Sequence, residues 1–535
     1  MKTMINSIIL ASCLALPLAS CSDSDAAPEQ KDWSTTTYFN SSDAAAQDTY
    51  YKPAVGYVGD PMPFFDPVAG DFKVLYLQDF RPNPEGTYHP IWGVSTKDAA
   101  HYTALGELVS CGTLKSQDAA IGTGSTIYDE ASKLYYTFYT GNKYKPTGDE
   151  SAQVVMVATS ADFKTWTKDR TFLLKGQDFG YDKNDFRDPF VFKGDDGKFH
   201  MLISTKKGGK GSLAEFVSDD LKNWTDNGVF MTMMWDRFYE CPDLFKMGDY
   251  WYLVYSEIHH AVRRVQYFKG RTLDELKACT ANDVARWPDA HEGFLDSRGL
   301  YAGKTASDGT NRYLWGWCPT RSGKDNTAVG ASPAEPEWAG NLVCYKLIQH
   351  EDGTLTLGQV DAVSEKYNQD VAVEVKESQN MTEADGTYTL AGNVEQPDAY
   401  MLMGRLGSHN KISFTVTTSN EWDKFGISMV RGSDSKKYYT MVVNPENENN
   451  RKVNFEEQGV EGKGFIAGID GYVFARPADN VYNVTIYTDN SICVMYINDV
   501  CSYTNRIYGI QKNCWSINSY NGANVKISNL KISQY

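Results

Sequence analysis

The fold is decided by a repeated unit, and its clearest copy reads Phe186-Arg187-Asp188-Pro189-Phe190-Val191-Phe192. A polar turn at Asp195-Asp196-Gly197-Lys198 follows it, and then an apolar stretch runs from Phe199 to Ser204. Two runs of β-forming residues joined by a turn that contains Gly are typical of a β-hairpin. This stretch therefore predicts two antiparallel strands.

Four further copies of the unit occur between residues 57 and 320, spaced by roughly 50 to 65 residues. Repeated four-stranded units bury their faces only against their neighbours, and around an axis they form a β-propeller. We predict a five-bladed β-propeller at residues 46–355, with one short helix from Leu273 to Ala278. The four further copies begin at Tyr57-Val58-Gly59-Asp60-Pro61, at Gly122, at Tyr239-Glu240-Cys241-Pro242-Asp243 and at Gly299.

A different pattern begins after about residue 365. The stretches from Ile412 to Val416, Val484 to Tyr487 and Cys493 to Ile497 alternate or run apolar, with polar turns between them. Short strands of this kind are typical of two packed antiparallel sheets. We predict a β-sandwich at residues 370–535, so the expected fold class is all-β, a five-bladed β-propeller followed by a C-terminal β-sandwich.

The N-terminus has the pattern of an export signal. Lys2 precedes an apolar run from Met4 to Ala19 that is too short for a stable membrane span, and the run ends in Leu18-Ala19-Ser20-Cys21. This ending resembles a bacterial lipobox, whose cysteine is lipidated after cleavage. We expect a signal peptide at residues 1–21, lipid anchoring through Cys21 and a flexible tether at residues 22–45.

The residues after the lipobox bear on the location of the protein. Ser22-Asp23-Ser24-Asp25 resembles the acidic signal of lipoproteins displayed on the cell surface. We expect an exported lipoprotein of the outer membrane, on the cell surface or the periplasmic face. That location would suit association with a glycan-uptake system.

Composition narrows the class of ligand. The net charge is -16 and the pI is about 5.0, which disfavours nucleic acid, because phosphate binding needs clustered Lys and Arg. The 34 Tyr and 12 Trp could offer flat faces to sugar rings, although most of them would fill a β core. The expected partner is a neutral oligo- or polysaccharide.

Eight cysteines lie between Cys111 and Cys514, and none forms a C-x-x-C pair. This spacing disfavours a zinc site, and we expect neither a metal nor a cofactor. The cysteines are too sparse for a disulfide framework in a chain of 535 residues. Buried free thiols are one interpretation, and one or two disulfides are the other.

Three acidic residues occupy nearly equivalent places in the repeat. Asp60, Asp188 and Glu240 each lie just before or within the first strand of a unit, so in a propeller they should converge at one end of the channel. Burial and like charge would raise the pKa of at least one carboxyl, and such groups are kept mainly for acid and base chemistry. Taken singly, an Asp-Pro pair can simply start a turn and a buried Glu can simply be ion-paired. Their repeated placement predicts a catalytic site.

The same segments resemble glycoside hydrolase family 32, which comprises invertases, levanases, inulinases and fructan exohydrolases. Gly59-Asp60-Pro61 is similar to the family's nucleophile segment Asn-Asp-Pro-Asn, Arg187-Asp188-Pro189 to its Arg-Asp-Pro segment, and Glu240-Cys241-Pro242-Asp243 to its Glu-Cys segment. The resemblance covers roughly residues 50–530. Shorter similarities occur at Tyr76-Leu77-Gln78, Trp92-Gly93-Val94-Ser95, Gly124-Ser125, Tyr301-Ala302, Trp315-Gly316-Trp317, Glu337-Trp338-Ala339-Gly340 and Tyr496-Ile497-Asn498-Asp499.

The resemblance implies a role for each of these carboxyls. Asp60 would be the nucleophile that attacks the anomeric carbon of a fructofuranosyl unit, and Glu240 would be the acid and then the base of a retaining double displacement. Asp188 would stabilise the transition state, and Arg187 would bind the sugar with it. Gln78, Trp92 and Ser125 would line the substrate pocket.

Side chains of these types also have ordinary structural uses. Gln78 and Ser125 could make strand hydrogen bonds, and Trp92 could be a core aromatic residue. Cys241 is expected to pack near the acid rather than to act as a nucleophile.

The chain departs from the family pattern around the nucleophile. Gly59 stands where the family has Asn, and Met62 and Pro63 replace the Asn-Gly that follows. Val94 stands where the family has His, and His89 is not an obvious substitute. These changes predict a divergent subgroup with an altered ring or linkage preference.

Two alternatives remain open at the level of sequence. Inverting arabinofuranosidases and xylosidases of the same clan use an equivalent Asp as a base toward water, and a wider spacing of the carboxyls would favour them. A non-catalytic glycan-binding lipoprotein of the surface is the other alternative. A pure binding site has no need of an acid together with a nucleophile, which argues against it.

Overall fold

The structure is a computed structural model, and it describes residues 49–80, 88–233, 238–257, 264–279, 293–320, 338–431, 438–445, 452–458, 472–511 and 513–535. Cys21, the signal peptide and the tether lie outside the described residues, and so does Glu337. All described residues belong to one unit of the chain, Trp33–Tyr535. Within them, no helix is both long and apolar enough to cross a membrane.

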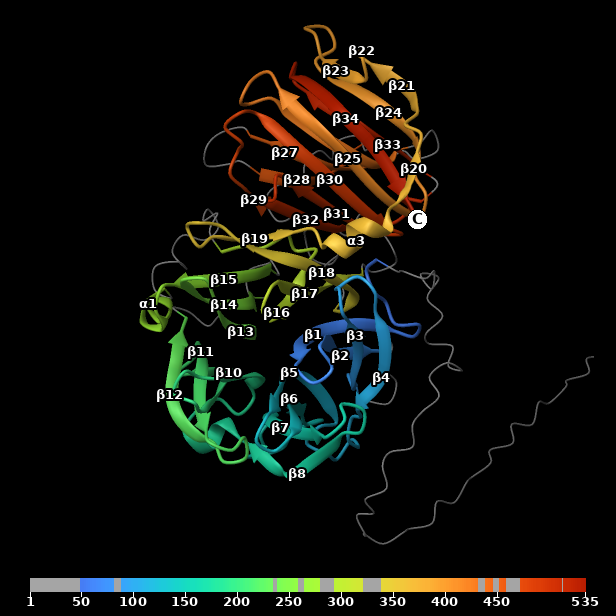
Figure 1. The fold of residues 1–535 in the computed structure, drawn as a ribbon. Helices are drawn as coiled ribbons and strands as arrows, with labels where there is room; N and C mark the ends of the chain where they lie inside the picture. Colours follow the sequence, from blue (N-terminus) through green and yellow to red (C-terminus); the bar gives the residue numbers. More distant parts are fainter. Residues whose placement is uncertain are drawn as a thin grey trace, which may run out of the picture. The chain divides into compact units, whose positions relative to one another are not determined.

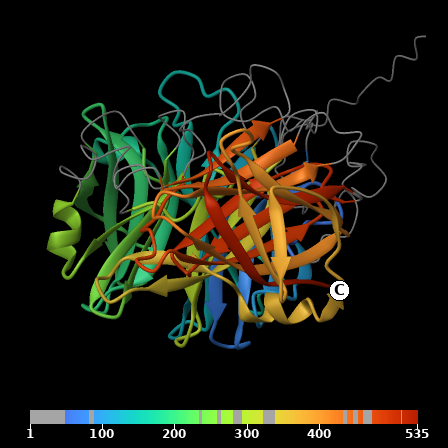
Figure 2. The same ribbon diagram turned by 90° about the horizontal axis from the view of Figure 1, so that it is seen from above.

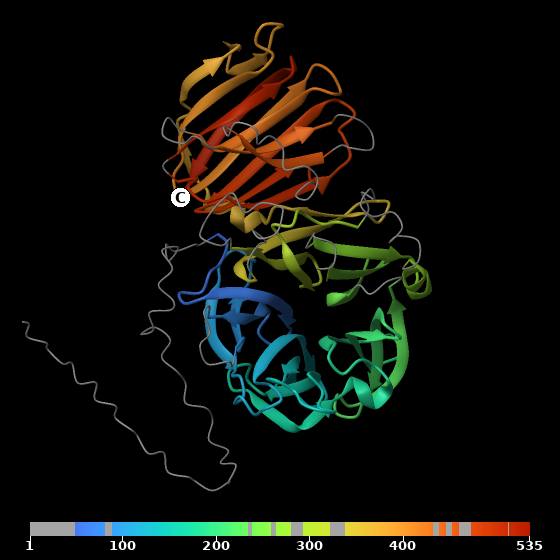
Figure 3. The same ribbon diagram turned by 180° about the vertical axis from the view of Figure 1, so that it is seen from behind.

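The N-terminal region forms five antiparallel blades that follow one another around a common centre (Figure 1). They belong to four hydrogen-bonded sheets, because the first and the last blade are paired in one eight-stranded sheet. The same ring, blue through green to yellow, is visible from behind in Figure 3. This is the predicted five-bladed propeller. Its strands are β1 (Tyr57–Asp66), β2 (Asp71–Asp79), β3 (Ile91–Thr96) and β4 (Thr103–Val109) in blade 1; β5 (Ala120–Asp129), β6 (Leu134–Asn142), β7 (Gln153–Ser160) and β8 (Thr167–Leu174) in blade 2; β9 (Phe186–Lys193), β10 (Phe199–Lys207), β11 (Lys210–Ser218) and β12 (Thr225–Thr232) in blade 3; β13 (Glu240–Met247), β14 (Tyr250–Glu257) and β15 (Arg264–Gly270) in blade 4; and β16 (Tyr301–Ser307), β17 (Arg312–Pro319), β18 (Gly340–Gln349) and β19 (Leu355–Gly358) in blade 5.

The first strand of each blade lies at the centre of the ring. β1 contacts β5, β5 contacts β9, β9 contacts β13, β13 contacts β16, and β16 contacts β1. Blades 1 and 5 are also joined by pairing of Val58 with Gly340, which closes the ring. Side chains on β1, β5, β9, β13 and β16 are therefore the ones that can meet across blades.

Apolar side chains fill the spaces between blades. Leu202 and Leu213 of blade 3, for example, share one cluster with Leu244 and Leu253 of blade 4. A blade thus buries its faces against its neighbours, as the repeat predicts. The predicted short helix is confirmed as α1 (Leu273–Ala278), which follows β15, and the hydroxyl of its N-cap residue Thr272 accepts a hydrogen bond from the N–H of Glu275.

The C-terminal region forms two antiparallel sheets, which is the predicted β-sandwich and confirms the all-β fold class. β25 (His409–Thr418) alternates strictly between buried and partly exposed residues, as expected for a strand with one face on the core. The sandwich strands, orange to red, lie nearest the viewer in Figure 2. One sheet contains β20 (Gln369–Val371), β22 (Met381–Ala384), β23 (Thr387–Ala391), β25, β30 (Val481–Asp489), β31 (Ile492–Ile497), β32 (Cys501–Arg506) and β34 (Asn524–Gln534); the other contains β21 (Val375–Gln379), β24 (Ala399–Arg405), β26 (Lys424–Arg431), β27 (Tyr438–Asn444), β28 (Lys452–Gln458), β29 (Tyr472–Val473) and β33 (Cys514–Tyr520).

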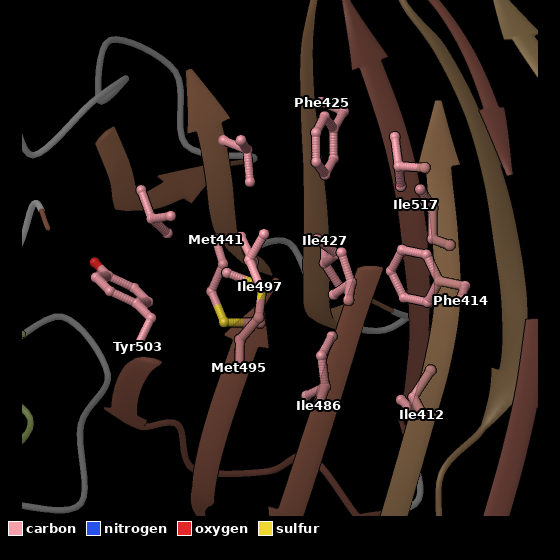
Figure 4. Packing of buried hydrophobic residues seen from close by; sticks show 14 of the residues in the cluster. Ile412, Phe414, Phe425, Ile427, Met441, Ile486, Met495, Ile497, Tyr503 and Ile517 are labelled. Atoms are coloured by element: carbon pink, nitrogen blue, oxygen red, sulfur yellow. The ribbon is translucent and has the colours of Figure 1, made fainter. Parts of the chain in front are cut away.

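The two sheets enclose a dry core. Ile412 and Ile486 come from one sheet, Ile427 and Met441 come from the other, and their side chains face one another in Figure 4. The remaining regular elements are the 3-10 helix η3 (Gly176–Phe179) and α3 (Asp361–Lys366), which lies between β19 and β20. The eight cysteines from Cys111 to Cys514 are free thiols in the structure.

Buried polar groups connect β32 of the sandwich to blade 5 and the segment before it. The guanidinium of Arg506, almost fully buried, donates to the carbonyl oxygens of Cys318 (2.9 Å) and Pro319 (3.0 Å). The carboxylate of Asp296 accepts hydrogen bonds from the N–H (2.8 Å) and the hydroxyl (2.8 Å) of Thr504. Such satisfied buried networks are costly to break, so the sandwich braces blade 5.

Candidate active site

The first strand of each blade carries a β-bulge at the same place. In β1 the pairing with β2 shifts between Gly59 and Met62, and in β13 the pairing with β14 shifts between Glu240 and Asp243. The same irregularity occurs in β5, β9 and β16. A bulge twists the strand and re-aims its side chains, and here it does so around the centre of the ring.

The shared bulge defines two sets of equivalent positions. We call the first extra residue of each bulge the bulge residue, and the residue before it the pre-bulge residue. Four bulge residues have positive φ angles although none of them is Gly, a strained conformation that tends to occur at functional sites. The bulge residues are Asp60 (φ 28°), Thr123, Asp188 (φ 57°), Cys241 (φ 52°) and Ala302 (φ 52°), and the pre-bulge residues are Gly59, Gly122, Arg187, Glu240 and Tyr301.

This register refines the sequence-based alignment of the three carboxyls. Asp60 and Asp188 are true counterparts, but Glu240 is a pre-bulge residue, and Cys241 occupies the place that corresponds to the two aspartates. A proline follows the bulge residue in all three blades, so Pro242 is the counterpart of the prolines after Asp60 and Asp188. The three side chains nevertheless lie close together, as shown by the electrostatic interaction of Asp188 with both Asp60 and Glu240.

Asp60 is held by donors from the two neighbouring blades. The hydroxyl of Thr123 in blade 2 donates to Oδ2 (2.7 Å), and the indole N–H of Trp317 in blade 5 donates to Oδ1 (3.0 Å). Burial raises the pKa of the Asp60 carboxyl and Glu240 adds to the rise, while the two hydrogen bonds and His89 act in the opposite direction. Its side chain remains partly exposed, so a ligand can reach the fixed carboxylate.

Glu240 belongs to a chain of pre-bulge residues. Its Oε1 accepts a hydrogen bond from the guanidinium of Arg187 (3.0 Å), and its Oε2 accepts one from the hydroxyl of Tyr301. Arg187 also donates to Oδ1 of Asp185 (2.7 Å), and its guanidinium lies 3.8 Å from the ring centre of Phe238. Glu240 is thus oriented from both sides.

Asp188 is the most buried of the three carboxyls, with 4% of its surface exposed. Its Oδ2 accepts the N–H of Cys241 (2.9 Å), and its own N–H donates to the hydroxyl of Thr140 (2.9 Å). Burial raises the pKa of Asp188 to about 6; the Glu240 and Asp60 charges also raise it, and Arg187 lowers it. The expected effect of burial and like charge is therefore confirmed for this carboxyl.

A buried lysine supplies positive charge next to the carboxyls. Lys304 is 2% exposed, its Nζ donates to the carbonyl oxygen of Gly124 (2.8 Å), and its charge interacts with Asp188 and Asp60. Burial lowers the pKa of Lys304, and the surrounding acidic groups raise it. Burial likewise raises the pKa of the Cys241 thiol, which suits the expected packing role.

The predicted sugar-binding residues of blades 1 and 2 make structural contacts. The side-chain amide of Gln78, fully buried, donates to the carbonyl oxygen of Val55. The hydroxyl of Ser125 donates to the carbonyl oxygen of Pro189 (2.9 Å) and accepts the N–H of Val191 (2.9 Å), so it joins blades 2 and 3. These contacts match the structural use considered for Gln78 and Ser125, whose substrate-binding role stays a prediction.

Trp92 lies on the third strand of blade 1, partly buried. Its ring packs edge-on against Phe80 (centroids 5.7 Å apart), and its buried indole N–H has no hydrogen-bond partner among the residues that the structure describes. A buried donor without a partner is costly to the fold. The substrate-binding role of Trp92 stays a prediction.

Sequence reasoning missed four site residues, three that bond to the carboxyls and one that interacts with Asp60 through its charge. Thr123, Trp317 and Tyr301 bond to Asp60 or Glu240, and His89 interacts electrostatically with Asp60. A strict alignment of the repeats would have found Thr123 and Tyr301, because they occupy the bulge and pre-bulge positions of their blades. For His89 the sequence carries no such signal, because the residue lies between strands.

The arrangement suits nucleophilic and acid–base chemistry. It combines a partly exposed carboxylate fixed by two donors, a second carboxyl oriented through both oxygens and a buried third carboxyl. Among the described residues, no group of three or more His, Cys, Asp or Glu side chains is arranged to hold a metal ion.

Asp188→Asn is expected to stabilise the fold at neutral pH. The pKa of Asp188 is about 6 in the folded state, above the ordinary value near 4, so its contribution to stability falls as the pH rises from about 4 to 6. The amide removes that penalty, on the order of 3 kcal/mol above pH 7, and can still accept the N–H of Cys241. Urea unfolding at pH 4 and pH 7.5 measures the free energy of unfolding of the parent and the variant. Equal destabilisation at both pH values would contradict the prediction.

Comparison with protein families gives two matches that together span most of the chain. Residues 50–360 match the model of the glycosyl hydrolases family 32 N-terminal domain, and residues 353–532 match the GH32, BT1760-like, C-terminal domain. Among characterised proteins, the insoluble β-fructofuranosidase isoenzyme CWINV2 of Arabidopsis thaliana is 25% identical over 320 residues, which are 54% of this chain and 51% of that protein. Sucrose-6-phosphate hydrolase of Staphylococcus xylosus is 24% identical over 38% of this chain and 40% of its own length. The chain thus spans about half the length of the first relative and 40% of the second.

Solved structures share the fold over nearly the whole chain. The GH32 β-fructofuranosidase BmSUC1 of Bombyx mori superposes with a TM-score of 0.67 at 17% identity, covering 93% of this chain and 95% of that one. Exo-inulinase of Aspergillus awamori gives a TM-score of 0.66 at 15% identity, covering 91% and 98%. At these identities the likeness supports the propeller-and-sandwich fold alone.

Proposed function

The chain belongs to glycosyl hydrolase family 32, and from this premise we propose that it hydrolyses fructosyl linkages in sucrose-type saccharides or fructans. The observation that carries the proposal is the convergence of Asp60, Asp188 and Glu240 on the bulges of three blades. The family relatives named β-fructofuranosidase and sucrose-6-phosphate hydrolase support the choice of a fructosyl substrate.

In the proposed reaction Asp60 is the nucleophile. One of its oxygens attacks the anomeric carbon while the bond from that carbon to the leaving oxygen breaks and Glu240 gives that oxygen a proton. Glu240 then takes a proton from water, which attacks the same carbon and releases Asp60. Two displacements return the original configuration, so the reaction is retaining.

The remaining side chains position these groups. Thr123 and Trp317 fix the orientation of Asp60, and Tyr301 fixes that of Glu240. In this proposal the negative charge of Asp188, which is buried, stabilises the positive charge that develops on the sugar ring, and stabilising developing charge in a dry site is a large contribution to catalysis. Arg187 offsets the repulsion among the carboxylates through its contact with Glu240.

Release of sugar from a panel of glycosides tests this function. We expect fructose from sucrose, inulin or levan, and no arabinose from arabinofuranosyl oligosaccharides. The configuration of the first product, followed by NMR before it mutarotates, separates retention from inversion. Arabinose release or an inverted product would overturn the proposal in favour of the sister families, and binding without any product would favour a glycan-binding protein.

We also propose that the protein is an exported lipoprotein, anchored to the outer membrane through Cys21, where it could serve a glycan-uptake system. The support is the segment Leu18-Ala19-Ser20-Cys21, which follows an apolar run of signal-peptide length. We expect Cys21→Ser to abolish incorporation of labelled palmitate and to release the protein from the membrane fraction. Cys111→Ser is the control, and labelling that survives Cys21→Ser would reject the anchor. Protease treatment of intact cells tells the surface from the periplasmic face.

A further inference from the structure

A row of four aromatic rings leads from Asp60 to the surface, and we call it the aromatic row. Tyr88 meets His89 edge-on (centroids 4.6 Å apart), and His89 stacks on Trp338 (4.1 Å, planes 23° apart). Trp338 lies 6.1 Å from Trp317, whose indole N–H bonds to Asp60. The outer end is open, since 41% of Tyr88 is exposed. The row therefore connects solvent to the proposed nucleophile through three ring contacts and the hydrogen bond from Trp317 to Asp60.

Trp338 occupies the place of a missing side chain. A Cβ atom added at Gly59 would lie 2.2 Å from the indole of Trp338, so a side chain at position 59 and this indole exclude each other. Position 59 is the pre-bulge position of blade 1, equivalent to Arg187 and Glu240 in blades 3 and 4. The indole thus stands where blades 3 and 4 place a polar side chain beside the carboxyls.

The exposed end of the row is rigidly held. The N–H of Tyr88 donates to the carbonyl oxygen of Ala119 (3.3 Å), and its carbonyl oxygen accepts the N–H of Ile121 (3.1 Å) and the thiol of Cys111 (3.0 Å). His89 has a positive φ of 63°, a strained conformation for a residue that is not Gly. A ring on a fixed backbone loses little entropy when a ligand binds, which is the property of a binding surface.

We propose that the aromatic row is a stacking surface for a carbohydrate chain, with Trp338 beside the fructosyl unit at Asp60 and Tyr88 under units farther along the chain. This inference rests on the proposed fructosyl hydrolase function and names its substrate class as oligosaccharides and polysaccharides rather than disaccharides. Aromatic rings contribute a large apolar contact surface without requiring fixed hydrogen bonds, so the row would tolerate successive sugar units.

Tyr88→Ala tests the outer end of the row. We expect kcat/KM to fall by about twofold on sucrose and by about 5- to 10-fold on long fructans, mostly through KM, because one aromatic contact per bound chain is lost. Trp422→Ala, which removes a ring that is 44% exposed in the β-sandwich, between β25 and β26, should leave the values of both substrates unchanged. A loss on Tyr88→Ala that is equal for short and long substrates, or no loss at all, would overturn the inference.

Gly59→Ala tests the inner end of the row. The added methyl group must displace the indole of Trp338, so we expect KM to rise at every chain length, in contrast to the length-dependent effect of Tyr88→Ala. An unchanged KM would show that the indole does not border the bound sugar. Failure of the proposed function itself would look different, because the parent protein would then release no fructose from any of these substrates.

Discussion

Asp60→Asn is expected to lower the rate of fructose release by roughly 10⁴-fold or more, because it removes the group that forms the covalent intermediate. The amide has the same shape as the carboxylate and can still accept one of the two hydrogen bonds from Thr123 and Trp317. The loss should therefore appear in kcat, while the affinity for a bound saccharide should change little. Steady-state kinetics together with calorimetric titration of a fructan oligosaccharide separate the two quantities.

The matched control for this variant is Asp66→Asn in the same strand. Asp66 lies at the far end of β1, where its Oδ1 accepts a hydrogen bond from the hydroxyl of Tyr135 (2.9 Å), and it is 1% exposed. The control thus removes a buried carboxylate from β1 without touching the candidate site, and its activity should remain that of the parent. A variant of Asp60 that keeps more than about a tenth of the parent's kcat could not have lost its nucleophile.

The propeller was predictable because its signal is local and repeated. Each copy of the unit carries a run of β-forming residues, a polar turn and a second run, so the strands and their order around the ring follow from a pattern that occurs five times. β9 and β10, for example, cover the quoted stretch from Phe186 to Ser204. The sandwich was predictable for the same reason, since the alternation in β25 is visible in the sequence.

The contacts within the site were less predictable because they join residues far apart in the chain. Trp317 is separated from Asp60 by 257 positions and Tyr301 from Glu240 by 61. The local sequence around these residues gives no sign of either contact. The one-residue offset of Glu240 was also missed, because a pattern of acidic residues does not report the register of a bulge. Alignment on the prolines that follow the bulge residues would have placed it.

The departure at Gly59 shows a different limit. The sequence reveals that a polar side chain is lost beside the nucleophile, and this predicts an altered specificity. It does not reveal that an indole from a segment after β17 takes the vacated space, because that depends on how Trp338 and His89 stack. The polar side chain that the sequence lacks at position 59 is thus replaced in the structure by the indole of Trp338.

Glu240→Gln is expected to lower kcat on natural fructosides by about 10²- to 10⁴-fold, the usual contribution of a positioned general acid. The amide cannot give a proton to the leaving oxygen, and its NH₂ group would face the guanidinium of Arg187 or the hydroxyl of Tyr301. Glu215→Gln in blade 3 is the matched control: it removes a carboxylate that is 8% exposed and is bonded to His200 (3.0 Å) and Asn227 (2.9 Å). That control should leave kcat unchanged.

Changing the leaving group of the substrate and adding an external nucleophile identify the role of Glu240 more sharply than the size of the fall in kcat does. An aryl fructoside with an acidic phenol leaves without protonation, so the variant should form the intermediate on Asp60 at nearly the parent's rate and then stall, which appears as a burst of phenol. Azide needs no general base, so it should restore turnover and give a fructosyl azide of unchanged configuration. If the activity of the variant on the aryl fructoside falls as severely as its activity on sucrose, and azide has no effect, Glu240 acts as a structural partner of Arg187 and Tyr301 rather than as the acid and base.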